Sequence, residues 1–221
     1  MLSVINSIAL QGLDGILVKI EVDISSGLPA WDIVGLPGVS VKESKERVRT
    51  AIKNCEIDLP SRKYVINLSP ANIRKEGSIF DLAIAVGVLQ AIGELNENVK
   101  LEETIFIGEL SLDGNIESIN GVLPMCIEAL KFGVKRIFVP KKNVKEAACV
   151  NRIRNNRSFH FKRIVRLFKR KNQSRTRKIH QLRLREKWTN LLNWFWRSKR
   201  PIRNEKSLRN SSSTEITTRS W

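Results

Sequence analysis

Apolar and polar residues alternate through the first part of the chain. The segments SVINSIALQG (3–12) and GILVKIEVDIS (15–25) both show this period of two, with the turn-forming letters LDG between them. Alternation on both sides of a short turn predicts a β-hairpin. The segments AWDIVGLPG (30–38) and KYVINLS (63–69) predict two further strands.

Two other segments show helical spacing. From Ser40, a candidate N-cap, to about Cys55, apolar residues recur on one face of a predicted helix. The segment IRKEGSIFDLAIAVGVLQAIG (73–93) begins as a basic loop and continues as a helix that is apolar on nearly all sides. Such a helix belongs inside a domain. The expected core face of the first helix consists of Val41, Val48, Ala51, Ile52 and Cys55.

The next segments complete the predicted domain. TIFIGELSLDGNI (104–116) predicts a hairpin with Asp113-Gly114 at its turn, and a helix from about Val122 to Phe132 precedes the strand KRIFVP (135–140). Since strands arranged in hairpins alternate with helices that must pack on them, the predicted class is α+β with a mixed sheet.

Composition divides the chain near Val150. The formal net charge is +17, but residues 151–221 hold 22 Lys and Arg against three acids, a net of +19, which leaves −2 for residues 1–150. Residues 151–221 also contain no Gly, Ala or Asp. We therefore expect a folded domain over 1–150 and a basic tail over 151–221 that is disordered or weakly helical.

Cysteine usage and hydropathy favour a cytoplasmic chain. Cys55, Cys126 and Cys149 form an odd set without paired or metal-like spacing, which suits a reducing compartment. The N-terminal residues lack the features of a signal peptide, and no stretch approaches the roughly 18–20 apolar residues of a membrane span. We expect no metal and no membrane partner.

Ser78, which follows Gly77 in RKEGS, is the serine whose setting suggests a nucleophile, since a loop entering a buried helix can expose a hydroxyl. The simpler interpretation, which we favour, is a helix N-cap. No histidine precedes His160 to act as a base, so an active serine would require a nearby lysine.

Several long motifs, in order, carry a family resemblance. SIALQGLDGILVKIEVDISSGLPAWDIVGLPGVSVKESKERVRTAI, NLSPANIRKEGSIFDLAIAVGVL and IGELSLDGNI with NGVLP resemble the N-terminal domain of magnesium-chelatase-like AAA+ ATPases of the ComM or YifB type. The resemblance implies the ribosomal protein S5 domain 2-like fold, which is shared with the proteolytic domain of Lon protease and the C-terminal domain of the RadA recombination protein.

The resemblance also implies that catalytic groups have been lost. Where the Lon pattern has a nucleophilic serine this chain has Ile79, and about where it has the partner lysine this chain has Leu123. Neither side chain can attack a carbonyl or carry a proton. The expected domain is therefore non-proteolytic and has no catalytic residues.

Full-length members of this family act as ring-forming, ATP- and magnesium-dependent DNA motors associated with natural transformation. Their ATPase module requires a P-loop, G-x-x-x-x-G-K-[ST], and this sequence contains no such run. We therefore expect no ATP cofactor and no enzymatic activity for the chain as given, and a DNA partner through an accessory surface. The candidate phosphate contacts, which are interrupted by acidic residues, are Lys42, Lys45, Lys53, Arg74 and Lys75.

The tail agrees with the family in another reading frame. Within codon degeneracy, Arg154–Ser158 shifted by one base reads E-I-I-G-V, the strand expected at this point of the family domain. The same shift turns Trp194–Ser213 into G-F-G-E-V-K-G-Q-L-E-M-K-K-A-L-E-I-A-A-A, which resembles the family's approach to its P-loop. We interpret residues after about 150 as out-of-frame translation, and expect marginal stability because the family's last strand and helix would be missing.

Three alternatives remain open. The basic tail with its Trp residues could bind nucleic acid in a salt-sensitive way, which predicts loss of binding when 151–221 are removed. The segment FHFKRIVRLFKRK (159–171) could form a basic amphipathic helix on an anionic membrane. A Ser-Lys hydrolase using Ser78 predicts labelling by a serine-directed probe, lost in Ser78→Ala.

Overall fold

The computed structural model describes residues 2–12, 14–96, 101–150, 153–158 and 160–169. Its first two elements are the antiparallel strands β1 (Ser3–Gln11) and β2 (Asp14–Ser25). Their register runs from Ser3 opposite Val22 to Gln11 opposite Asp14, which confirms the predicted hairpin.

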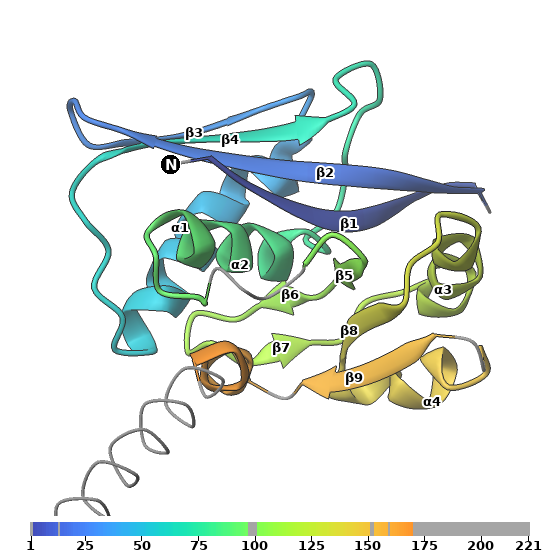
Figure 1. The fold of residues 1–221 in the computed structure, drawn as a ribbon. Coiled ribbons are helices and arrows are strands. Elements are labelled where there is room, and N and C mark those ends of the chain that lie inside the picture. Colours follow the sequence, from blue (N-terminus) through green and yellow to red (C-terminus); the bar gives the residue numbers. More distant parts are fainter. Residues whose placement is uncertain (1, 13, 97–100, 151–152, 159, 170–221) are drawn as a thin grey trace, which may run out of the picture. The chain divides into compact units, whose positions relative to one another are not determined.

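One mixed sheet contains both strands of this hairpin (Figure 1). Its strand order is β3-β4-β2-β1-β5-β8-β9. β2 pairs antiparallel with β1 and β4, whereas the pairs β3–β4, β1–β5, β5–β8 and β8–β9 are parallel. The α+β class with a mixed sheet is thereby confirmed. The remaining strands are β3 (Ala30–Val34), β4 (Lys63–Ser69), β5 (Thr104–Phe106), β8 (Arg136–Pro140) and β9 (Arg154–Ser158).

Two helices cover the same face of the hairpin half of the sheet (Figure 1). α1 (Val39–Asn54) buries the apolar face predicted for it, and Cys55, just after its end, is buried too. α2 (Asp81–Ala91) is buried along almost its whole length, as its uniform apolar sequence predicts. Its close approach to the sheet requires Gly87, because a Cβ there would lie 2.9 Å from Val22 Cγ2.

The second half of the described chain adds α3 (Val122–Lys131), α4 (Val144–Ala147), a 3-10 turn (Lys141–Asn143) and a two-stranded hairpin. The hairpin is shorter than predicted: it pairs only β6 (Glu109–Leu110) with β7 (Ile116–Glu117), around the expected Asp113-Gly114 turn. The residues before it form β5, since a central position beside β1 pairs more of their backbone.

The described fold continues past the predicted boundary at Val150. β9 pairs along its length with β8, and residues 161–169 form a helical segment. A strand and a helix therefore occupy the region that we expected to be low in order and to lack both. The reason is a spacing of i, i+3, i+4 and i+7, which places four apolar side chains on one helix face. These buried side chains are Phe161, Ile164, Val165 and Phe168.

Packing of the 161–169 segment involves three aromatic rings. The Phe168 ring centroid lies 6.1 Å from that of Phe106 and 5.8 Å from that of Phe138, which stack on each other at 4.8 Å. Because the apolar face of this segment is buried against the domain, these side chains are not presented to a membrane in the structure.

Predictions for residues 170–221 lie outside the described residues. In the part of the chain described, no helix is long and apolar enough to cross a membrane.

Candidate functional site

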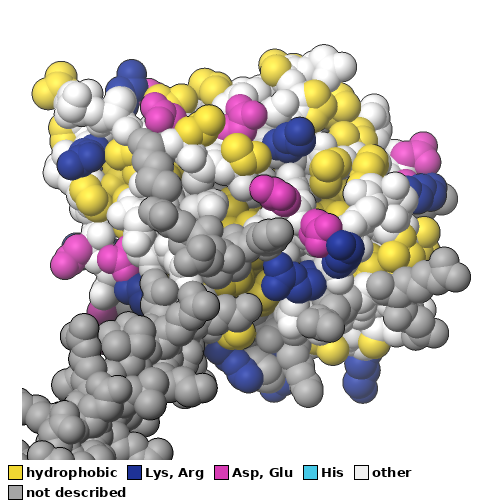
Figure 2. All heavy atoms as spheres, in the orientation of Figure 1, with side chains coloured by type: hydrophobic (Ala, Val, Ile, Leu, Met, Phe, Trp, Pro, Cys, Tyr) yellow, Lys and Arg dark blue, Asp and Glu magenta, His cyan; other side chains and the backbone are white. Residues whose placement is uncertain are grey.

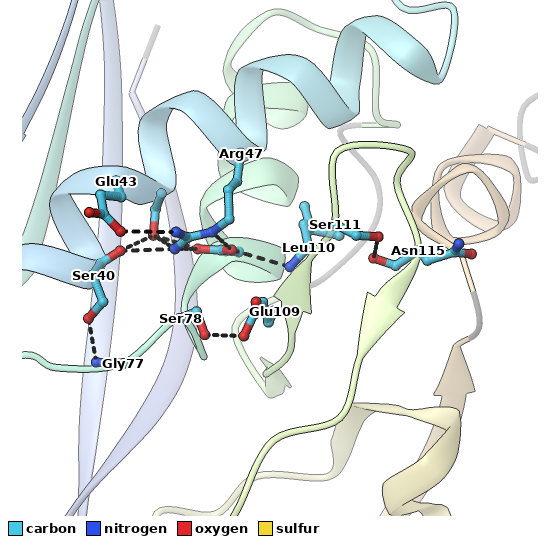
Figure 3. A network of polar contacts seen from close by, with 11 residues as sticks. Ser40, Glu43, Arg47, Gly77, Ser78, Glu109, Leu110, Ser111 and Asn115 are labelled. Atoms are coloured by element: carbon cyan, nitrogen blue, oxygen red, sulfur yellow. Dashed lines mark hydrogen bonds and ion pairs between the residues drawn. The ribbon is translucent and has the colours of Figure 1, made fainter.

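The candidate site surrounds the loop that leads into α2, where α1, α2 and β6 meet (Figure 3). At its centre is Asp81, the first residue of α2, whose side chain is fully buried. Arg47 of α1 binds this carboxylate with two nitrogens, Nε to Oδ2 at 2.7 Å and Nη2 to Oδ1 at 3.1 Å. A bidentate pair of this kind fixes both side chains in one geometry.

Further donors complete the shell of the Asp81 carboxylate. The hydroxyl of Ser44 donates to Oδ1, and the backbone N–H of Leu110 donates to Oδ2 at 3.2 Å. Arg47 Nη2 also donates to the Ser40 carbonyl at 2.9 Å. Burial raises the pKa of the Asp81 carboxyl, and the hydrogen bonds from Arg47 and Ser44 oppose that shift. The network joins α1, α2 and β6, which makes it a structural anchor.

Sequence reasoning missed this buried pair. Asp81 stands inside an otherwise apolar helix, and Arg47 lies between the buried positions Ser44 and Val48. Two signals could have revealed the pair: a single acid in an apolar run, and a single base in the buried half of an amphipathic helix. Both point to a pair because a buried charge requires a partner.

Ser78 is not the N-cap that we predicted. α2 begins at Asp81 with Phe80 at the cap position and no side-chain cap bond, and the Ser78 hydroxyl donates to the Glu109 carboxylate. Residues 78–80 are held as a turn because Gly108 N–H donates to Ile79 O at 2.9 Å and Leu82 N–H donates to Gly108 O at 3.1 Å. Ser40 is likewise not a cap, since its Oγ accepts from Gly77 N–H at 3.0 Å.

Lys75 lies in the same loop but does not reach the solvent. Its side chain is only 1% exposed, and its ammonium group donates to the carbonyls of Gly35, at 3.0 Å, and Pro70. Burial lowers the pKa of Lys75. This placement corrects the prediction of an exposed phosphate contact. Because the Lys75 ammonium group is bound to the Gly35 and Pro70 carbonyls, it has no role as a base for Ser78.

The two positions implied to have lost a catalytic dyad both lie in apolar surroundings. Ile79 and Leu123 are both half-buried, and both pack against the second apolar cluster of the domain. An apolar environment of this kind stabilises neither an alkoxide nor an ammonium ion. Prominent buried members of that cluster are Ile8, Ile105, Val122, Met125, Cys126 and Ile137.

The other candidate phosphate contacts are exposed. Lys42, Lys45 and Lys53 project from α1, and Arg74 forms a 2.9 Å ion pair with Glu76. On the face drawn in Figure 2, basic and acidic side chains are interspersed, with no large patch of one sign among the coloured atoms. The structure therefore places all four residues on the surface, and of these it brings Lys42 and Lys45 together at one hollow beside β3, which Lys53 and Arg74 do not line.

No metal site is evident where the structure can be read. Among the described residues, no group of three or more His, Cys, Asp or Glu side chains is arranged to hold a metal ion. The three cysteines are all free thiols, and two of them, Cys55 and Cys126, are buried. The described chemistry of the site thus consists of hydrogen bonds and ion pairs.

Comparisons with known proteins find relatives that agree with one another on the family. The family model for subunit ChlI of Mg-chelatase matches residues 20–143. The chain is 41% identical over 150 residues to the uncharacterized protein YifB of Escherichia coli and 38% identical over 150 residues to competence protein ComM of Haemophilus influenzae. Each alignment covers 68% of this chain and 29% of the relative.

A more distant similarity connects the chain to proteases. Lon protease of the Aster yellows witches'-broom phytoplasma is 31% identical over 148 residues, which cover 64% of this chain and 18% of that protein. The chain therefore spans less than a third of the length of each of these relatives.

Proposed function

The chain belongs to the family of subunit ChlI of Mg-chelatase, and from this premise we propose that its folded part is the non-catalytic, Lon-like N-terminal domain of a ComM- or YifB-type AAA+ ATPase. The domain would serve DNA processing as an accessory module and would adopt the ribosomal protein S5 domain 2-like fold. Similarity to competence protein ComM supports the link to competence.

The observation that carries this proposal is the environment of Ile79 and Leu123. Both residues stand where the Lon pattern has its reactive serine and lysine, and both pack on the same apolar cluster. Similarity to Lon protease supports a common origin. An apolar pair at these positions stabilises the domain and performs no proton transfer.

A labelling experiment tests the loss of the dyad. The purified chain is treated with a fluorophosphonate probe, and we expect no covalent adduct, with Ser78→Ala giving the same result. The double variant Ile79→Ser/Leu123→Lys, which restores both residue types of the dyad, is compared with the unmodified chain, and Ile79→Ser alone is its control. An adduct on the unmodified chain that Ser78→Ala abolishes would contradict the proposal and favour a Ser78 hydrolase.

An ATPase assay tests the second half of the proposal. The chain as given contains no P-loop motif, so we expect no release of phosphate from ATP and Mg²⁺ above that of the heat-unfolded chain. Turnover that survives purification to homogeneity would contradict a non-catalytic role.

We also propose that translation leaves the ancestral frame near codon 150. In β9, the shifted reading places Ile where the chain has Asn155, and the Asn155 Oδ1 atom is buried without a hydrogen-bond partner among the described residues. An apolar residue would remove this unpartnered oxygen, together with the hydrogen bond that Asn155 Nδ2 donates to Ala147 O at 2.8 Å. Resequencing the gene from codon 145 onward tests the proposal. A restored frame followed by a P-loop would make the true product a full-length motor, whereas a confirmed slip would make this chain a real truncation product.

A second candidate function rests on charge. Residues 151–221 carry a net +19, which favours salt-sensitive binding to DNA irrespective of its origin. Removal of residues 170–221 should abolish binding and its salt dependence if the tail is responsible. If the domain surface is responsible, binding should instead fall in the triple variant of Lys42, Lys45 and Lys53 to Glu. Fluorescence anisotropy with a labelled oligonucleotide at several salt concentrations separates the two outcomes.

A further inference from the structure

Strand β3 forms one edge of the sheet. In the described part of the chain its only strand partner is β4, so the other side of Ala30–Val34 presents backbone N–H and C=O groups without a neighbouring strand. An unpaired edge of this kind is a template for another extended chain. Helix α1 lies beside it, and two hollows follow the boundary between β3 and α1.

The two hollows form one feature, which we name the β3–α1 groove. Their volumes are about 300 and 470 Å³, and they share Trp31 and Lys45. The Trp31 ring stacks on the Tyr64 ring with centroids 4.6 Å apart, so the groove has a fixed aromatic wall. Since the second hollow is lined by four consecutive residues of β3, the groove runs along the strand edge.

Positive charge concentrates in the β3–α1 groove. Lys42, Lys45 and Arg49 follow one another along α1 at i, i+3 and i+7, which places them on one helix face. Lys63 and Arg62 add to these on the β4 side, whereas Asp32 and Glu46 are the acids that line the hollows. Five cations against two acids stand out in residues 1–150, whose net charge is −2.

We infer that the β3–α1 groove is a docking site for an extended acidic peptide of a partner protein, which adds to the sheet as a strand beside β3. Strand addition supplies main-chain hydrogen bonds, and alternate acidic side chains face the cations of α1. A nucleic-acid strand fits less well, because phosphate oxygens can accept hydrogen bonds from the free N–H groups of β3 but cannot donate to its free C=O groups, as a peptide backbone does.

The test uses the full chain and the peptide TETETETE as the probe. Backbone amide spectra of the ¹⁵N-labelled chain should show peptide-induced changes at 30–34 and in the first half of α1, with cross-strand contacts between peptide and β3 amides. Changes confined to other parts of the chain would overturn the proposal, and they would reveal charge attraction by the basic tail alone.

Two variants and two probes sharpen the result. Lys42→Glu/Lys45→Glu should weaken binding about tenfold, whereas Lys53→Glu/Lys145→Glu, equal in charge and outside the groove, should leave it within about twofold. Methylation of alternate peptide nitrogens should abolish the changes at β3. Unchanged binding of the methylated peptide, or displacement of TETETETE from β3 by oligodeoxythymidine, would overturn strand addition.

Discussion

β8 and β9 are adjacent parallel strands built from opposite kinds of residue. In β8, Ile137, Phe138 and Val139 are buried, and Phe138 stacks on a neighbouring ring. In β9 the sequence is RNNRS, although all five residues pair with β8. Backbone pairing therefore tolerates a sequence that side-chain chemistry does not favour, because the hydrogen bonds of a ladder are the same for every residue.

Two buried polar side chains, Asp81 and Asn155, differ in how far they are satisfied, although Gln90 and Thr104 in residues 1–150 also hold a buried oxygen without a partner. The Asp81 carboxylate accepts hydrogen bonds from Arg47, Ser44 and Leu110, whereas Asn155 in β9 donates from Nδ2 to Ala147 O at 2.8 Å but leaves its amide oxygen unpartnered among the described residues. A buried polar group with hydrogen-bond partners costs the fold little, whereas one without a partner lowers stability. The comparison can be tested through stability.

The largest effect is expected from ending the chain at Val150. This removes β9 and the 161–169 segment, whose four buried apolar side chains each contribute about 1.5–3 kcal/mol on burial. The sum is comparable to the stability of a typical domain, so cooperative thermal unfolding should be lost. The control ends at Lys169. Identical melting curves by circular dichroism would mean that residues 153–169 add nothing to the fold.

Asp81→Ala should lower the free energy of unfolding by about 3–5 kcal/mol, because it leaves the Arg47 guanidinium without its buried partner. Glu43→Ala is the control, since Glu43 also contacts Arg47, at 3.7 Å, but is exposed. Its effect should stay within about 0.5 kcal/mol. Urea denaturation measures both, and equal effects would contradict the anchoring role of Asp81.

Phe168→Ala should cost about 3 kcal/mol, because it opens a cavity beside Phe106 and Phe138. Leu167→Ala, on the exposed side of the same helical segment, should change stability by less than about 0.5 kcal/mol. A similar small effect for both variants, measured by urea denaturation, would show that this segment does not pack on the domain in solution.

Asn155→Ile should leave the free energy of unfolding within about 1 kcal/mol of the parent value, since it removes an unpartnered amide oxygen but also removes the hydrogen bond that Asn155 Nδ2 donates to Ala147 O at 2.8 Å. Asn143→Ile is the matched control. The Asn143 side chain accepts from Ile119 N–H at 3.1 Å and donates to Ile119 O at 2.8 Å, so its loss should cost about 1–3 kcal/mol. Equal destabilisation in the two variants would remove the contrast between Asn155 and Asn143.

The smallest effect concerns Lys75. Its pKa is lowered in the folded state from the ordinary value of 10.5, so protonation favours the unfolded chain. The contribution of Lys75 to the free energy of unfolding is therefore complete above pH 10.5, and it is lost as the pH falls through the pKa of Lys75 in the folded state. Relative to Lys75→Met, the parent chain should gain on the order of 1 kcal/mol as pH rises across that window. Parallel pH profiles of the two proteins would contradict this.

Sequence periodicity predicted the hairpin, α1 and its core face, the buried α2 and the sheet class, because these elements depend on local alternation and helical spacing. It failed where contacts with residues from other elements determine the position of a side chain. Ser78 was predicted as a cap, but Gly108 holds its turn, and the Ser78 hydroxyl donates a hydrogen bond to Glu109. Lys75 was predicted as a surface cation, but the carbonyls of Gly35 and Pro70 bury it. Gly35, Gly108 and Glu109 are distant in sequence from the residues they contact, so no local pattern contains these partners.

The central place of β1 in the sheet has a consequence for synthesis. β1 pairs with β2 on one side and, through Asn6 and Ile105, with β5 on the other. While the ribosome makes the intervening residues, the β1 edge stays open and can pair with neighbouring nascent chains. Folding is thereby delayed until a strand nearly one hundred residues away emerges, and this interval is when the chain is most exposed to aggregation.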